Sequence, residues 1–249
     1  MENDYNDYIV GRNPVLEALK NNREVEKILI SKGQLKGSVN KIVGMAKDKK
    51  IPIQHVDKKH LDTISKGNTH QGVAALVTPY TYASIDDILN KAKSLEEDPF
   101  IIVLDEIEDP HNLGSIIRTA ECGGVHGIII PKRRSATITQ AVVKSSAGAV
   151  EHMLISKVTN ITDTLKELKE KGLWVYGADM DGKEYYFQRN FSGPKVLVIG
   201  NEGKGISRLV KENCDFLIKI PMLGKISSLN ASNAASILIY EVVRERYVK

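Results

Sequence analysis

The sequence is short of several residue types, and each shortage excludes a class of protein. Only two of its 249 residues are cysteine, Cys122 and Cys214, so a disulfide framework is excluded. Neither cysteine has the spacing of a metal ligand, and we therefore expect no metal site. Aromatic residues make up only 6% of the chain. With 42% hydrophobic and 27% charged residues, the composition is that of an ordinary globular protein.

Long hydrophobic runs are also missing. The longest apolar stretches, such as FIIVL at 100–104 and KVLVIG at 195–200, suit buried strands and are too short to span a bilayer. Residues 1–14 are acidic and polar, without the apolar run of a signal peptide. We expect a cytoplasmic protein without a membrane partner.

A strong charge of either sign is absent, since the formal net charge is only +4. Residues 1–79 contain 13 basic and 9 acidic residues, whereas the rest of the chain has equal numbers of each. The N-terminal third therefore carries the whole surplus. Such a surplus is compatible with binding to a phosphate backbone, and equally with a solvated basic surface.

The pattern of helix and strand signals divides the chain into two domains. In residues 1–78 these signals alternate, which predicts a compact α/β domain. The stretch TPYTYAS then breaks the pattern, and residues 79–98 are expected to form a linker and a first helix. Residues 99–249 are predicted to form the second domain.

The second domain has continuous apolar strands separated by helices. Strands of this kind indicate a parallel sheet that is covered on both faces, and therefore an α/β fold. Ligands of such sheets bind at the carboxyl ends of the strands. The loops that follow Leu104, Ile199 and Ile220 are therefore the candidate site.

The first loop leads into a helix. Asp109 and Pro110 form a turn signal, and Asn112 is suited to cap the helix. Gly114 permits a close approach, and Arg118 follows one helical turn later. An arginine here can bind a phosphate or a ribose hydroxyl; the alternative is a surface arginine packed on its own helix.

The second loop has the glycine-rich appearance of a phosphate cradle, but two familiar cradles are excluded. In a P-loop a lysine would stand where Ile206 is, and in a dinucleotide fingerprint a small residue would replace Arg208. What remains is a tight turn that begins at Gly200 and carries one carboxylate, Glu202. Because a carboxylate repels phosphate, the loop favours a cationic or neutral cofactor.

The third loop leads into the last helix through an unusual number of small polar residues. These are Ser227, Ser228, Asn230, Ser232 and Asn233. Such residues are poor in helix interiors, and capping explains only part of the cluster. Short side chains let another segment pass close by, while their hydroxyls and amides satisfy its polar groups.

Together, these loops resemble the motifs of the SpoU/TrmH family of ribose 2′-O-methyltransferases, within the SPOUT class. The matching residues are Asn112-Leu-Gly114-(x)₃-Arg118, Gly200-Asn-Glu202-(x)₂-Gly205, Ile220-Pro-Met222 and Ser228-Leu229-Asn230-Ala-Ser232. GRNPVLEAL at 11–19 and HQGVAALV at 70–77 resemble the family's accessory RNA-binding domain, which is similar in fold to ribosomal protein L30e. The resemblance is closest to bacterial 23S rRNA guanosine-2′-O-methyltransferases of the RlmB type.

The resemblance implies an α/β fold with a C-terminal SPOUT domain, whose parallel sheet contains a trefoil knot, and a small L30e-like N-terminal domain. It implies that S-adenosyl-L-methionine binds in the knot, where the small polar run lets the last segment thread through a loop. It also implies a homodimer formed through the catalytic domain. The expected cofactor-binding residues are Ile199, Gly200, Ile220, Met222, Leu229 and Asn230.

The implied activity is transfer of a methyl group to a ribose 2′-hydroxyl of RNA, with a guanosine in 23S rRNA as the target. The expected catalytic residues are Asn112, Arg118, Glu202, Ser228 and Asn230. Arg118 is expected to engage the acceptor ribose or its phosphate. The general base is either Arg118, although a guanidinium does not readily deprotonate, or Glu202, directly or through a water or phosphate that it orients. The expected RNA-binding residues are Arg12, Arg118, Lys132, Arg133 and Arg134; the alternative for the basic run 132–134 is a solvated loop.

Other readings stay open at this point. A relative of the same family could methylate tRNA, or confer antibiotic resistance by modifying rRNA. A non-catalytic RNA-binding factor of ribosome assembly could also keep the fold. The intact set of candidate catalytic residues argues against the last of these, because a binding protein has no need for all of them.

Overall fold

The computed structural model describes residues 8–21, 23–33, 37–226 and 228–247. Contacts between residues separate the chain into two compact units. The N-terminal unit comprises the chain up to Thr81 together with Thr137–His152. The C-terminal unit comprises Tyr82–Ala136 and the chain from Met153 onward.

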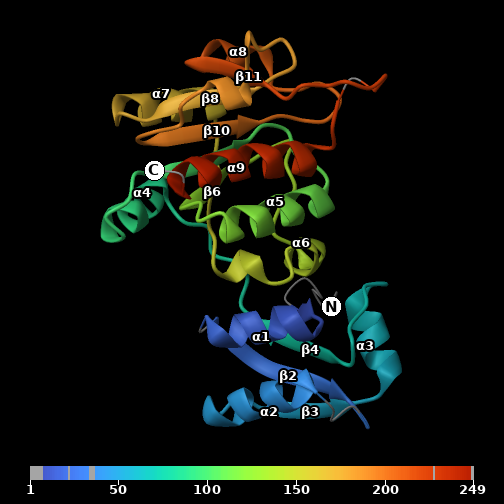
Figure 1. Ribbon diagram of the computed structural model, residues 1–249. Helices are drawn as coiled ribbons and strands as arrows, with labels where there is room; N and C mark the ends of the chain where they lie inside the picture. The colour runs from blue at the N-terminus through green and yellow to red at the C-terminus, as the bar shows by residue number, and fades with distance from the viewer. Residues whose placement is uncertain (1–7, 22, 34–36, 227, 248–249) are drawn as a thin grey trace. The chain divides into compact units, whose positions relative to one another are not determined.

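The N-terminal unit contains a four-stranded mixed sheet with the order β1-β4-β2-β3. Its strands are β1 (Tyr8–Val10), β2 (Val25–Ser31), β3 (Ile53–Val56) and β4 (Val73–Val77). Strand β4 is antiparallel to both of its neighbours, and β2 is parallel to β3. Its helices are α1 (Arg12–Lys20), α2 (Ser38–Asp48), α3 (Lys58–Ser65) and α6 (Gln140–Ser145), with a 3₁₀ turn η2 (Ala149–Glu151) (Figure 1).

Residues 137–152 differ from the predicted domain boundaries, which assigned them to the second domain. Their contacts group them with the N-terminal unit. Among these contacts is an ion pair in which Arg23 Nη1 lies 2.5 Å from Glu151 Oε1 and the two side chains are only 12% and 5% exposed. Arg23 also donates from Nη2 to the Thr78 carbonyl, at 2.8 Å. The sequence pattern did not indicate this grouping, because α6 continues the alternation of strands and helices that characterises the second domain.

The C-terminal unit contains a seven-stranded sheet with the order β7-β6-β5-β10-β8-β11-β9, and every neighbouring pair is parallel. Its strands are β5 (Phe100–Leu104), β6 (Gly127–Pro131), β7 (Leu154–Val158), β8 (Trp174–Ala178), β9 (Glu184–Tyr185), β10 (Lys195–Ile199) and β11 (Phe216–Lys219). Its helices are α4 (Ile85–Ser94), α5 (Pro110–Cys122), α7 (Ile161–Glu170), α8 (Arg208–Glu212) and α9 (Ala231–Tyr247), with a 3₁₀ turn η3 (Tyr186–Gln188).

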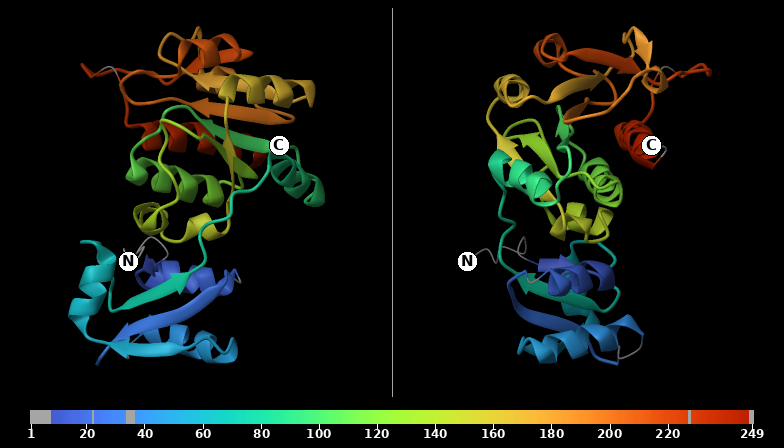
Figure 2. Two further views of the ribbon diagram at one scale, coloured as in Figure 1. Left: turned by 180° about the vertical axis from the view of Figure 1, so that it is seen from behind. Right: turned by 60° about the vertical axis from the view of Figure 1, so that its left-hand side comes forward.

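Helices cover both faces of this sheet. The right-hand view of Figure 2 shows α4 and α7 on one side and α5 and α9 on the other. Strands β5 and β10, at the centre, are buried at every residue, as a sheet covered on both faces requires. The predicted α/β fold with a parallel sheet is therefore confirmed. In the described ranges, no helix has the length and hydrophobicity that crossing a bilayer would require.

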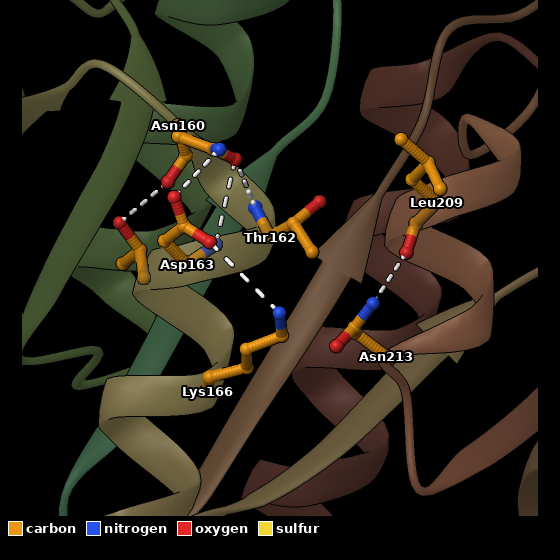
Figure 3. A network of polar contacts seen from close by, with 7 residues as sticks. Asn160, Thr162, Asp163, Lys166, Leu209 and Asn213 are labelled. Atoms are coloured by element: carbon orange, nitrogen blue, oxygen red, sulfur yellow. Dashed lines mark hydrogen bonds and ion pairs between the residues drawn. The ribbon is translucent and has the colours of Figure 1, made fainter.

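Polar side chains fix the ends of the helices on the α7 side. Asn160 caps α7, because its Oδ1 accepts hydrogen bonds from the backbone N–H groups of Thr162 and Asp163 at 3.0 and 3.4 Å (Figure 3). At the end of α8, Asn213 donates from Nδ2 to the Leu209 carbonyl at 2.8 Å. These contacts stabilise the helix ends, so that the apolar sides of α7 and α8 pack on the sheet.

Candidate active site

The loops after β5 and β10 meet because the two strands are adjacent and in register, with Leu104 opposite Ile199. The Asp105 backbone N–H donates to the Ile199 carbonyl at 2.9 Å, which extends the pairing past the strand ends. The Asp105 carboxylate in turn accepts from the Ser207 backbone N–H at 2.7 Å, just before α8 begins. Both predicted loops therefore begin next to each other, and these hydrogen bonds hold them together.

The glycine-rich turn after β10 is closed on itself. Asn201 and Gly205 exchange two backbone hydrogen bonds, at 3.1 and 2.8 Å. A Cβ atom added to Gly200 would lie 2.2 Å from the carbonyl carbon of Gly205, so this position accepts only glycine. The close crossing explains the glycine at 200 without a phosphate, in agreement with the exclusion of both phosphate cradles.

The structure joins three predicted catalytic residues from three loops in one hydrogen-bond network. Asn112, at the start of α5, donates from Nδ2 to Glu202 Oε1. Asn230 donates from its Nδ2 to Asn112 Oδ1 at 2.9 Å and lies 3.4 Å from Glu202 Oε1. Within the described part of the chain, Glu202 has no cationic partner. Its negative charge is therefore held by neutral amides and left uncompensated.

Asn230 has a second role, at the beginning of α9. Its Oδ1 accepts from the backbone N–H and the hydroxyl of Ser232, at 2.9 and 2.6 Å. Further along α9, the Ser236 hydroxyl lies 3.2 Å from the Thr119 hydroxyl of α5. The small polar side chains thus both begin the helix and bind a neighbouring element. Ser227, which belongs to the same run, lies outside the described residues.

A cavity of about 180 Å³ opens beside this network, between the loops after β8, β10 and β11. Seven of the residues predicted for the site line it: Ile199, Gly200, Glu202, Ile220, Met222, Ser228 and Leu229. Asn112 and Asn230 touch Glu202 rather than the cavity wall. The walls combine backbone and apolar side chains with six charged residues, which are Asp179, Asp181, Glu202, Lys204, Lys211 and Lys219.

Sequence reasoning missed several residues that line the cavity. Those with long or charged side chains are Asp179, Met180, Asp181, Lys204, Lys211 and Lys219. Asp179 follows directly after β8, so the rule about carboxyl ends of strands could have found it. Lys211 lies inside α8, where a basic residue gives no such signal. Its ammonium is 2.8 Å from Asp179 Oδ2, and this contact raises the pKa of Lys211.

Arg118 lies on α5 but does not belong to the hydrogen-bonded network. It is exposed, and it has no ion pair or hydrogen bond with the described residues. Asn112 lies nearly two turns earlier on the same helix, with its side chain buried against Glu202. The guanidinium is therefore free to meet a ligand that approaches from solvent.

The predicted RNA-binding residues have different surroundings. Lys132 and Arg133 are exposed and form no ion pair with any described residue. Arg134 is paired with Glu106 at 2.9 Å, which raises the pKa of the arginine. In the N-terminal unit, Arg12 donates from Nε to the Gln71 carbonyl at 3.1 Å, so part of its binding capacity is used structurally. No group of acidic, histidine or cysteine side chains among the described residues is arranged to hold a metal ion.

Two family models match the chain. Residues 99–240 match the SpoU rRNA Methylase family, and residues 8–83 match the RNA 2′-O ribose methyltransferase substrate-binding domain. The chain is 50% identical over 240 residues to a Bacillus subtilis protein named as a putative TrmH family tRNA/rRNA methyltransferase, YacO, and the match covers 96% of each. A Staphylococcus haemolyticus protein with the same family name is 49% identical over 239 residues, again covering 96% of each chain.

Solved structures agree with the family models. The SpoU methyltransferase AviRb from Streptomyces viridochromogenes, in complex with the cofactor AdoMet, has a TM-score of 0.79 and 27% identity, covering 96% of this chain and 90% of its own. A TrmH/SpoU tRNA modifying enzyme from A. aeolicus has a TM-score of 0.56 and 28% identity, but covers only 65% of this chain and 85% of its own. The chain therefore belongs to the SpoU/TrmH family and is an RNA methyltransferase that uses S-adenosylmethionine.

Proposed function

We propose that this protein methylates the ribose 2′-hydroxyl of a guanosine in 23S rRNA. The observation that carries the proposal is the Glu202 carboxylate, which lines the cavity, is held by two amides and has no cationic partner among the described residues. A carboxylate that lines the cavity without a cationic partner suits a positively charged sulfonium. The name of the substrate-binding model that matches residues 8–83 supports ribose as the acceptor.

The cavity residues fit the cofactor. Ile199, Gly200, Ile220, Met222 and Leu229 would hold its adenosine and methionine parts, mainly through backbone groups and apolar contacts. Asn230 would assist from the neighbouring network. Bound S-adenosylmethionine would supply a methyl group activated by the sulfonium; the ribose oxygen attacks this methyl group, and the cofactor's sulfur is the leaving group.

The protein's own contribution is alignment and control of charge. We assign Arg118 to the acceptor, because its exposed guanidinium has no partner among the described residues and can bind the ribose or its phosphate. Arginine is not the proton acceptor in this scheme, since a guanidinium does not deprotonate readily in proteins. Glu202, directly or through a water that it orients, removes the proton from the attacking hydroxyl.

Asn112 and Asn230 orient this base. Both amides donate to the same oxygen of Glu202, which leaves its second oxygen available to the hydroxyl. Ser228 lines the cavity near these groups and would border the acceptor ribose. Lys132, Arg133, Arg134 and Arg12 would bind the phosphates of the RNA.

The proposal includes further properties that the family resemblance implies. The last segment of the C-terminal unit would thread through a loop to form a trefoil knot. Two copies of the chain would form a dimer through this unit, each contributing to the other's acceptor site. The protein would act in the cytoplasm, during the processing of rRNA.

A tRNA substrate is the second candidate, because a solved relative that covers 65% of this chain is named as a tRNA modifying enzyme. The N-terminal unit favours rRNA instead. The match to the tRNA modifying enzyme covers only 65% of this chain, so about a third of the chain has no counterpart in that enzyme. The two candidates differ in substrate and share the same chemistry.

The deciding experiment offers the purified protein methyl-tritiated S-adenosylmethionine with either bulk rRNA or bulk tRNA, followed by digestion to nucleosides. Label in 2′-O-methylguanosine from rRNA supports the proposal. Label in a base-methylated nucleoside, or only in tRNA, overturns it. Mapping of ribose methylation in a deletion strain and in the strain with the gene restored would then identify the nucleotide.

A further inference from the structure

Asp179 is a buried carboxylate in the cavity wall that the mechanism does not use. It follows β8 directly, and β8 lies between β10 and β11, the two strands whose loops form the opposite walls. Its side chain is only 6% exposed, although it lines the cavity. A buried charge of this kind needs specific partners, and its partners indicate what else it could bind.

The turn that carries Asp179 is fixed by close packing. The Asp181 backbone N–H donates to Asp179 Oδ1 at 2.9 Å, and the Gly182 N–H donates to the Asp179 carbonyl at 3.1 Å. A Cβ atom added to Gly182 would lie 2.8 Å from the carbonyl carbon of Ile218, in β11. The carboxylate therefore has one position, at the carboxyl end of the sheet.

Lys211 neutralises Asp179 from the other side. Its ammonium lies 2.8 Å from Asp179 Oδ2, and 3.5 Å from the exposed Asp181 carboxylate. Lys211 also lines the cavity. Because Lys211 already neutralises the Asp179 carboxylate, a ligand needs no charge of its own to bind there, and neutral hydroxyl donors suit the remaining acceptor positions.

The carboxylate has spare capacity for such donors. Its two oxygens offer about four acceptor positions, and the contacts with Asp181 and Lys211 use two of them. A carboxylate at the end of a parallel strand is well suited to a pair of ribose hydroxyls, as in dinucleotide-binding folds. The adenosine part of S-adenosylmethionine carries two such neighbouring hydroxyls.

We propose that Asp179, held in place by Lys211, accepts hydrogen bonds from the ribose hydroxyls of the cofactor and so selects for them. This inference rests on the proposed cavity as the cofactor site. Asp179 is then a binding residue, and Lys211 a positioning residue that acts through it.

The test measures binding by calorimetry, with S-adenosylhomocysteine and its 2′-deoxyribose analogue as the two probes. Wild-type protein should bind the parent compound about tenfold more tightly than the analogue, because the analogue leaves an acceptor unpaired. Asp179→Asn should weaken binding of the parent about tenfold and remove the preference between the two probes. Glu212→Gln is the matched control, since it removes one negative charge next to Lys211 on the exposed side of α8 and should change neither affinity.

Three results would count against the proposal in distinguishable ways. If wild-type protein binds neither probe, the cavity is not the cofactor site, and the proposed function fails with it. If Asp179→Asn changes neither the affinities nor the preference between the probes, Asp179 does not contact the ribose. If it weakens both probes equally and so keeps the preference, the ion pair only supports the turn. Should Asp179→Asn not fold, Lys211→Met replaces it; binding should then fall a few-fold with the preference retained, and an unchanged affinity would exclude the positioning role.

Discussion

The two units use glutamate and arginine in opposite ways. In the N-terminal unit, Glu151 and Arg23 form a direct pair with almost no exposure to solvent. In the C-terminal unit, the described residues bind Glu202 only through amides, and none of them forms an ion pair or hydrogen bond with Arg118. The same two residue types are thus partners in one unit and are kept apart in the other.

In the proposed mechanism, this difference separates structural charge from functional charge. The Arg23–Glu151 pair helps to hold residues 137–152 in the N-terminal unit, and each charge has a partner within the protein. We propose that the charges of Glu202 and Arg118 are left for a ligand to satisfy, as binding and catalysis require. Four substitutions test whether the charges are divided in this way.

The largest effect is expected for Glu151→Ala. It leaves the Arg23 guanidinium buried without its partner, which costs about 3–5 kcal/mol of stability. Urea unfolding of the N-terminal unit should show this loss. Lys32→Ala is the control, because its pair with Asp57 is exposed and should contribute less than about 1 kcal/mol. Equal losses in the two variants would mean that the buried pair is not structural.

Arg118→Ala should lower the rate of methyl transfer by about a thousandfold, because the acceptor loses its charged ligand. This corresponds to a rise of about 4 kcal/mol in the activation free energy. Affinity for S-adenosylhomocysteine, measured by calorimetry, should stay within about twofold of wild type. The unfolding midpoint should not change, since Arg118 has no partner among the described residues. A large loss of cofactor affinity would show that Arg118 binds the cofactor and not the acceptor.

Glu202→Gln should lower single-turnover methyl transfer by about a hundredfold, or about 2.7 kcal/mol. Glutamine keeps an oxygen for the amides of Asn112 and Asn230, so stability should be nearly unchanged. If the single-turnover rate of this variant equals that of wild type, Glu202 neither removes the proton nor orients the water that does so.

The smallest effect is a change in how stability depends on pH, which adds to the loss of the ion pair itself. Burial raises the pKa of Glu151, and the Arg23 guanidinium partly offsets the rise. A carboxyl whose pKa is higher in the folded state binds more protons there, so the free energy of unfolding falls as pH rises through that window. Arg23→Ala removes the offset. Its unfolding free energy should therefore fall more steeply than that of wild type from about pH 4.5 upward, as urea titrations at several pH values can test. Parallel curves would contradict this account.

Much of the site could be predicted because local rules place it. Continuous apolar runs indicated the parallel sheet, and the carboxyl ends of β5, β10 and β11 indicated the loops. Glu202 stood out in its glycine turn because a carboxylate is out of place in a phosphate cradle. Asp179 follows the same rule at the end of β8 and was overlooked, whereas Lys211 sits inside a helix and gave no signal.

The sequence by itself determined the α/β class, the family and the residue types of the site, since these depend on short-range patterns and spacing. The tertiary structure alone decided which residues meet. It joined Asn112, Glu202 and Asn230 from three distant loops and paired Arg23 with Glu151 across 128 positions. Such pairs follow from strand order and packing, and the spacing of residues along a chain carries no record of either.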